Sequence, residues 1–129
     1  MPTDRSSQIR VLVVEDQVFL ADDLAETLEE AGMQVVGPIG RLNPALELAR
    51  DANIDAAILD INLGDDERVF PLADLLAERG VPFMFVTGYE EDVIPARHRN
   101  RPRLGKPVTH DALLRALDRV VDSRDGVSN

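Results

Sequence analysis

The chain of 129 residues contains no cysteine, which excludes disulfide bonds, zinc–thiolate sites and thiol catalysis. It has no apolar run close to the roughly 20 residues that a membrane-spanning helix requires. Residues 1–8 lack the apolar stretch of a signal peptide. We therefore expect a cytoplasmic protein without a membrane partner.

Positive charge is scarce, and lysine almost absent. The formal net charge is −10, which argues against nonspecific nucleic-acid binding because such binding relies on a positive field. Lys106 is the only lysine, and every other basic side chain except the two histidines is an arginine. Lysine offers a compact point charge, whereas arginine offers a wide fork. The single lysine therefore indicates a specific role for a compact positive charge at position 106.

Short apolar runs alternate with amphipathic segments about five times along the chain, at a length that suits one domain. We expect strands at 9–14, from 34 to a break at Gly37-Pro38, and at 55–60, 81–86 and 101–104, with helices at 18–31, 43–52, 69–79 and 110–122. In the first helix Val18 and Ala21 begin the inward face. This alternation predicts a doubly wound α/β fold with a parallel five-stranded sheet, order 2-1-3-4-5, and an ordered core over about 8–122.

Polar residues stand at the ends of four of these strands. They are Glu15-Asp16, Asp60, Thr87 and Lys106-Pro107. In open α/β sheets ligands bind beyond the carboxyl ends of the strands, and the expected strand order makes these four strands neighbours. The sequence therefore predicts that the six residues converge on one site.

The residue types at that site suit metal-dependent phosphoryl chemistry. Three carboxylates repel one another unless a cation is present, and oxygen ligands at a sheet edge suit Mg²⁺. An aspartate can accept a phosphoryl group as an acyl phosphate. The Lys106 ammonium could neutralise phosphoryl charge, and the Thr87 hydroxyl could donate a hydrogen bond to a phosphoryl oxygen.

These motifs resemble the receiver domain of two-component response regulators, with its flavodoxin-like fold, over nearly the whole chain. The resemblance implies that Asp60 is the phosphoacceptor. It implies that Asp16 and Asp60 bind Mg²⁺ directly, with the Asn62 carbonyl as a third ligand, and that Glu15 acts through water. The Asn62 side chain would be either a turn former or a residue that tunes phosphoryl lifetime.

The same resemblance assigns the other side of the site. Thr87 and Lys106 would be the switch hydroxyl and the phosphate counter-ion, and the Lys106–Pro107 peptide would be cis. Most receivers carry an aromatic residue where this chain has Arg103, so the usual coupling between threonine and aromatic cannot operate in that form. Tyr89 could take part instead, could cover the site and slow attack by water, or could be an ordinary surface residue.

A narrower resemblance is to the single-domain "FAT GUY" receivers of alphaproteobacteria. It is carried by PFMFVTGY at 82–89, DINLG at 60–64, FPLAD at 70–74 and LGKP at 104–107. The strict motif has alanine at the place of Val86. The resemblance implies a chain of one receiver domain over 1–129 without an output domain, partnered by a sensor histidine kinase of the HWE type.

The segment after the fourth strand departs from ordinary receivers, which have a full fourth helix there. Pro95 removes a backbone donor and clashes one turn back, so we expect a shortened or disordered fourth helix: at most one turn before Pro95, then a mobile loop. A helix that resumes after Pro95 is the alternative. The basic residues of this segment, from Arg97 to Arg103, form either a solvated loop or a docking surface for an acidic partner. Upstream, residues 65–67 are expected to be the solvated start of a helix.

Three functions compete at this stage. The first is a stand-alone receiver that signals to a protein partner or drains its kinase as a phosphate sink, with no catalysis on other substrates. The second is a receiver-like interaction module that does not depend on phosphorylation. The third, an enzyme or cofactor binder, is disfavoured because the dinucleotide motif G-x-G-x-x-G is absent and Asn62 stands where an aspartate-based phosphatase has a second carboxylate.

Overall fold

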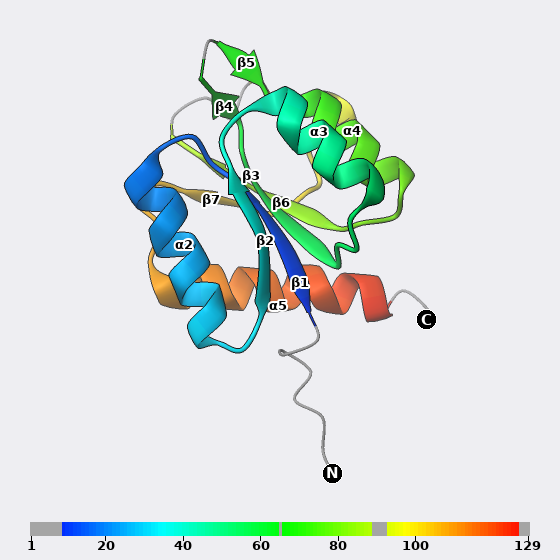
Figure 1. Ribbon diagram of the computed structural model, residues 1–129. Coiled ribbons are helices and arrows are strands. Elements are labelled where there is room, and N and C mark those ends of the chain that lie inside the picture. Colours follow the sequence, from blue (N-terminus) through cyan, green and yellow to red (C-terminus); the bar gives the residue numbers. More distant parts are fainter. Residues whose placement is uncertain (1–8, 65, 89–92, 127–129) are drawn as a thin grey trace.

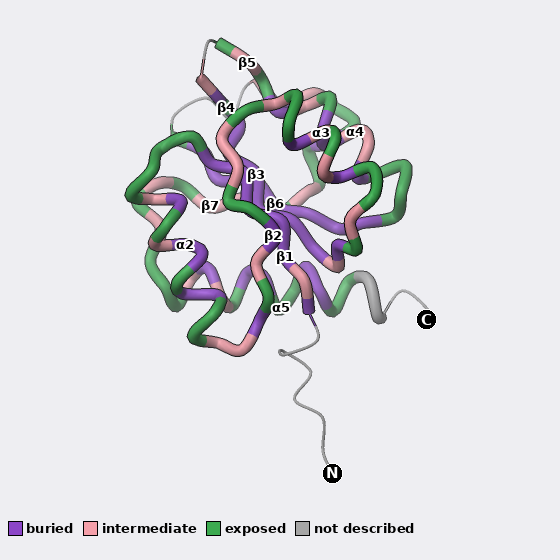
Figure 2. The backbone as a smooth tube through the Cα atoms, in the orientation of Figure 1, coloured by how far each residue is buried: buried purple, intermediate pink, exposed green. Residues whose placement is uncertain are grey.

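The computed structural model describes residues 9–64, 66–88 and 93–126, with side chains to 123 (Figure 1). Five parallel strands form the main sheet in the order β2-β1-β3-β6-β7, which confirms the predicted order. The strands are β2 Gln34–Ile39, β1 Arg10–Val14, β3 Ala56–Asp60, β6 Phe83–Thr87 and β7 Arg103–Gly105. The three central strands are buried (Figure 2), and apart from Arg10, Asp60 and Thr87 at their ends they are apolar because both of their faces are covered.

Helices cover both faces of the sheet, giving the flavodoxin-like fold. The helices are α2 Val18–Glu30, α3 Leu42–Asp51, α4 Phe70–Glu78 and α5 His110–Gly126. One core cluster joins the sheet to α2 and α5, and the other joins it to α3 and α4 (Figure 1). Alternation along β6 sends Phe83 and Phe85 to the α3/α4 face and Met84 and Val86 to the opposite face.

Strand β2 does not end at Gly37-Pro38, contrary to the prediction. It continues to Ile39 through a register shift opposite Val13, because two residues of β2 face one residue of β1. Gly37 has a φ of 97°, and a Cβ there would lie 3.0 Å from the Val13 carbonyl oxygen. Glycine supplies the bulge that lets the strand continue past the proline.

Gly37→Ala is expected to lower the free energy of unfolding by about 2–3 kcal/mol, since it combines an unfavourable φ with a backbone clash. Gly80→Ala is the matched control, because Gly80 has a φ of 73° but its Cβ would meet nothing within 4 Å. Urea unfolding of both variants separates the two costs. Equal destabilisation would contradict the role given to the close contact.

Between β6 and β7 the described residues contain no α-helix. A 3₁₀ turn, η2 Ala96–His98, follows Pro95, and Arg99 N–H closes it by donating to the Ala96 carbonyl. The helical turn expected before Pro95 falls on a stretch of which residues 89–92 lie outside the described part of the chain, so that expectation stays a prediction. Two side chains flank Pro95 in the core: Ile94 before it is 1% exposed, and His98 in the expected loop is 3% exposed. This absence among the described residues agrees with the shortened fourth helix that Pro95 predicted.

A small hairpin follows β3 where the start of a helix was expected. It pairs β4 Asn62–Leu63 with β5 Glu67–Arg68, and α4 begins only at Phe70. The Glu67 carboxylate accepts a hydrogen bond of 3.2 Å from Leu42 N–H, which ties the hairpin to the start of α3. Among the helices that the structure describes, none combines the length and apolar character needed to cross a bilayer.

Candidate functional site

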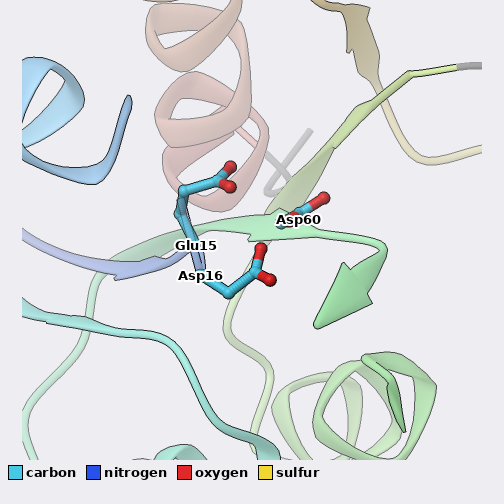
Figure 3. Close-up of side chains that lie close together, drawn as sticks. All are labelled: Glu15, Asp16 and Asp60. Atoms are coloured by element: carbon cyan, nitrogen blue, oxygen red, sulfur yellow. The ribbon is translucent and has the colours of Figure 1, made fainter. Parts of the chain in front are cut away.

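Three carboxylates meet at the carboxyl edge of the sheet (Figure 3). Glu15 and Asp16 follow β1 directly, and Asp60 is the last residue of β3. One oxygen from each lies within 4.8 Å of the others. Gly40 permits the approach of the β2–α3 connection, since a Cβ there would lie 3.1 Å from the Cα of Asp16.

Asp60 is the most perturbed acid of the cluster. It is 4% exposed, and burial followed by repulsion from Glu15 raises its pKa to about 8. The Lys106 ammonium acts in the opposite direction and lowers the pKa of Asp60. The free carboxyl is therefore easily protonated, and added positive charge would favour its ionised form.

Lys106 supplies part of that charge. Its Nζ lies 3.4 Å from Glu15 Oε2 and 3.5 Å from Asp60 Oδ1. The Lys106 N–H donates to the Thr87 carbonyl at 2.9 Å, which fixes the residue at the end of β7. The Lys106–Pro107 peptide is cis, as predicted. The lone lysine thus contacts two of the three carboxylates.

The donor set fits Mg²⁺. Glu15 Oε1 is buried without a hydrogen-bond partner, while Asp16 is exposed and leaves the site open on one side. Oxygen ligands on rigid strand ends with room for water suit this ion. Asn62 lies beside Asp16 and Asp60 in the pocket over the site, so it is placed to contribute as well.

Thr87 closes the other side. It ends β6, is 1% exposed, and its hydroxyl has no hydrogen-bond partner. Strand register places it next to Val86, the partner of Asp60, and opposite Gly105, which precedes Lys106. A buried hydroxyl without a partner at this position is ready to bond an incoming oxygen. Tyr89, the other predicted contributor, lies outside the described residues.

Two apolar residues at the mouth of the site were not predicted. A pocket of about 1110 Å³ over Asp60 and Lys106 is lined in part by Val18 and Phe19, whose exposed fractions are 68% and 90%. The placement of Val18 on the inward helix face was wrong, because Val18 is 68% exposed and lines this pocket. A phenylalanine off the apolar stripe of an amphipathic helix was the available signal.

Three arginines after Pro95 contact either their own segment or strand β6. Arg99 donates to the Ile94 carbonyl at 3.1 Å, Arg103 donates to the Arg99 carbonyl at 2.7 Å, and the Arg101 guanidinium lies 4.2 Å from the Phe83 ring centroid. The segment is held by these contacts, while Arg97 and Arg99 remain exposed to solvent. Docking of an acidic partner there stays a prediction.

The comparisons with known proteins agree with this geometry. Residues 11–118 match the response regulator receiver domain family. The chain belongs to that family. Transcriptional regulatory protein PdtaR of Mycobacterium tuberculosis is 28% identical over 115 residues, which are 87% of this chain and 56% of that protein. The chain thus spans about half the length of the curated relatives it matches.

Among solved structures, similarity extends to SdrG. The solution structure of SdrG from Sphingomonas melonis Fr1 is 39% identical with a TM-score of 0.79, covering 89% of this chain and 98% of that one. The BeF3-activated conformation of SdrG from Pseudomonas melonis Fr1 is 40% identical with a TM-score of 0.73, covering 87% and 95% of the two chains.

Proposed function

We propose that this receiver accepts a phosphoryl group on Asp60 from a sensor histidine kinase, in a Mg²⁺-dependent reaction, and signals by binding a protein partner or acts as a phosphate sink. The observation that carries the proposal is the buried Asp60 carboxyl, 3.5 Å from the only lysine and grouped with two further carboxylates. Its chemistry is confined to its own aspartate, so it is not an enzyme for other substrates.

The reaction follows from the side chains present. An Asp60 oxygen attacks the phosphorus of a phosphohistidine; a P–O bond forms, the P–N bond breaks, and the imidazole leaves. Glu15, Asp16 and Asp60 would hold Mg²⁺, which when bound supplies positive charge against the phosphoryl oxygens. The Lys106 ammonium supplies the charge of the protein itself.

Thr87 and Asn62 complete the assignment. The Thr87 hydroxyl, buried and unpartnered, would donate to a phosphoryl oxygen and so register the change at Asp60. Asn62 is exposed in the pocket, where its side chain can affect access of water to the acyl phosphate. These roles place the covalent change at the junction of β3 and β6.

The phosphodonor would reach Asp60 through the same pocket. Phe19 and Val18 stand exposed at its mouth and offer apolar contact to a docking protein. The resemblance carried by the motif at 82–89 supports the stand-alone mode of action and a kinase of the HWE type.

The proposal is tested by the intact mass of the protein after incubation with acetyl phosphate and Mg²⁺. One added phosphoryl group is expected, and it should be absent from Asp60→Asn and from a sample with EDTA. No addition, while a known receiver is labelled in parallel, would refute the proposal. The alternative would then be the interaction module independent of phosphorylation, to be pursued by capture of its partner.

A further inference from the structure

The segment from Ile94 to Arg103 stands in place of a helix, and few of its own side chains are buried. Ile94 and His98 are 1% and 3% exposed, and Ile94 belongs to the core cluster on the α3/α4 face. The His98 ring packs edge-on against Phe83 and Phe85 of β6, with centroid distances of 5.5 and 6.3 Å. A histidine thus occupies core space directly against the strand that ends at the site.

His98 is held there by a carboxylate of α4. Its Nε2 lies 2.7 Å from Asp74 Oδ1, and Arg97 bonds both oxygens of the same carboxylate at 2.7 and 2.9 Å. We call Asp74, Arg97 and His98 the Asp74 latch. Because a carboxylate only accepts, His98 Nε2 donates. His98 Nδ1 is buried without a partner, so Asp74 makes the one polar contact of the ring within the described structure.

The ion pair between Arg97 and Asp74 can separate at low cost. The side chains of Arg97 and Asp74 are 56% and 41% exposed. Water can solvate both once they separate, and exposed ion pairs contribute little to stability. His98 by contrast is buried against aromatic rings, so its release would expose a large new surface beside α4.

The latch lies on the same strand face as the switch hydroxyl. Strand alternation puts Phe83, Phe85 and Thr87 on one side of β6, and Phe85 contacts His98. A phosphoryl oxygen on Asp60 would give the unpartnered Thr87 hydroxyl an acceptor. The resulting rotation of the Thr87 side chain changes the packing beside Phe85, and through Phe85 the position of the His98 ring.

We propose that the Asp74 latch is closed in the unphosphorylated protein and opens when Asp60 is phosphorylated, releasing His98, Asp74 and Arg97 to the surface beside α4. The inference rests on the proposed function, because it requires phosphorylation of Asp60. His98 is thereby a positioning residue.

Carbethoxylation by diethyl pyrocarbonate tests the opening directly. The chain has two histidines, and His110, whose side chain is 60% exposed, serves as the internal reference for buried His98. Phosphorylation of the wild type is expected to raise modification of His98 relative to His110 by about fivefold or more. The mass of the same sample reports how much phosphoryl group is present.

A second measurement uses the thermodynamic linkage between phosphorylation and opening of the latch. If phosphorylation opens the latch, opening the latch must favour the phosphorylated state. Asp74→Ala removes the acceptor of both Arg97 and His98, and it should tighten binding of beryllofluoride with Mg²⁺, followed by NMR, by about fivefold or more. Glu78→Ala is the matched control, an exposed acid one turn further along α4, and should bind as the wild type does. Arg97→Gln, which leaves the His98 contact, should give a smaller gain.

The outcomes separate cleanly. A protein that carries the phosphoryl group while His98 stays protected would overturn the latch and leave the proposed function standing. Wild-type affinity for beryllofluoride in both Asp74→Ala and Arg97→Gln would do the same. If the mass shows no phosphoryl group under any condition, the proposed function fails and the latch with it.

Discussion

Asp60→Asn is expected to stabilise the metal-free protein, and the gain should grow by about 2–3 kcal/mol between pH 6 and pH 9. Burial raises the pKa of Asp60 from the ordinary aspartate value of 3.8 to about 8 in the folded chain. Between these values the folded state holds a proton that the unfolded state has released, so this group makes the free energy of unfolding fall as pH rises. Asparagine does not ionise and escapes this loss.

Urea unfolding in EDTA at the two pH values measures the gain. Asp118→Asn, at an exposed position of α5, is the control and should change the free energy of unfolding by less than about 0.5 kcal/mol at either pH. A gain in the stability of Asp60→Asn that does not change with pH would contradict the burial argument.

Mg²⁺ at about 100 times its Kd should stabilise the wild type by about 2.7 kcal/mol and the Asp60→Asn protein less.

Lys106→Met is expected to slow phosphoryl incorporation from acetyl phosphate about 100-fold, because it removes a charged donor aimed at the reacting group. The Lys106 Nζ is within 3.5 Å of both Glu15 and Asp60, and no other lysine exists to replace it. The rate is followed by intact mass at saturating Mg²⁺.

Lys106→Arg is the informative companion. It keeps the charge but presents a wide fork in place of a point, so its rate should lie between those of the wild type and Lys106→Met. Thermal unfolding of each variant shows whether the fold is kept. If Lys106→Met is labelled at the wild-type rate, the ammonium takes no part in the transfer.

Much of the fold was predictable because local patterns and topology agreed. The apolar runs before Asp60 and Thr87 are buried strands, and parallel strands bring their carboxyl ends to one edge. That geometry alone collected Glu15, Asp16, Asp60 and Lys106 from positions far apart in the chain. Strand-end chemistry is therefore readable from sequence.

Features without a periodic pattern of hydrophobic residues could not be predicted from the sequence. Two-residue strands such as β4 Asn62–Leu63 have no pattern to detect, and continuation through Gly37-Pro38 depends on a bulge that only the partner strand defines. The contact between Asp74 and His98 joins residues 24 apart and arises from the packing of a helix against an irregular segment. Tertiary contacts decided these places.

The bulge in β2 has a further consequence for association between molecules. β2 is one edge of the sheet, and within it Pro38 lacks an N–H while the bulge disrupts the row of free backbone groups. The other edge, β7, is three residues long and follows Pro102. Both edges are thus poor templates for an added strand, so a protein with this sheet can accumulate without pairing edge to edge into aggregates.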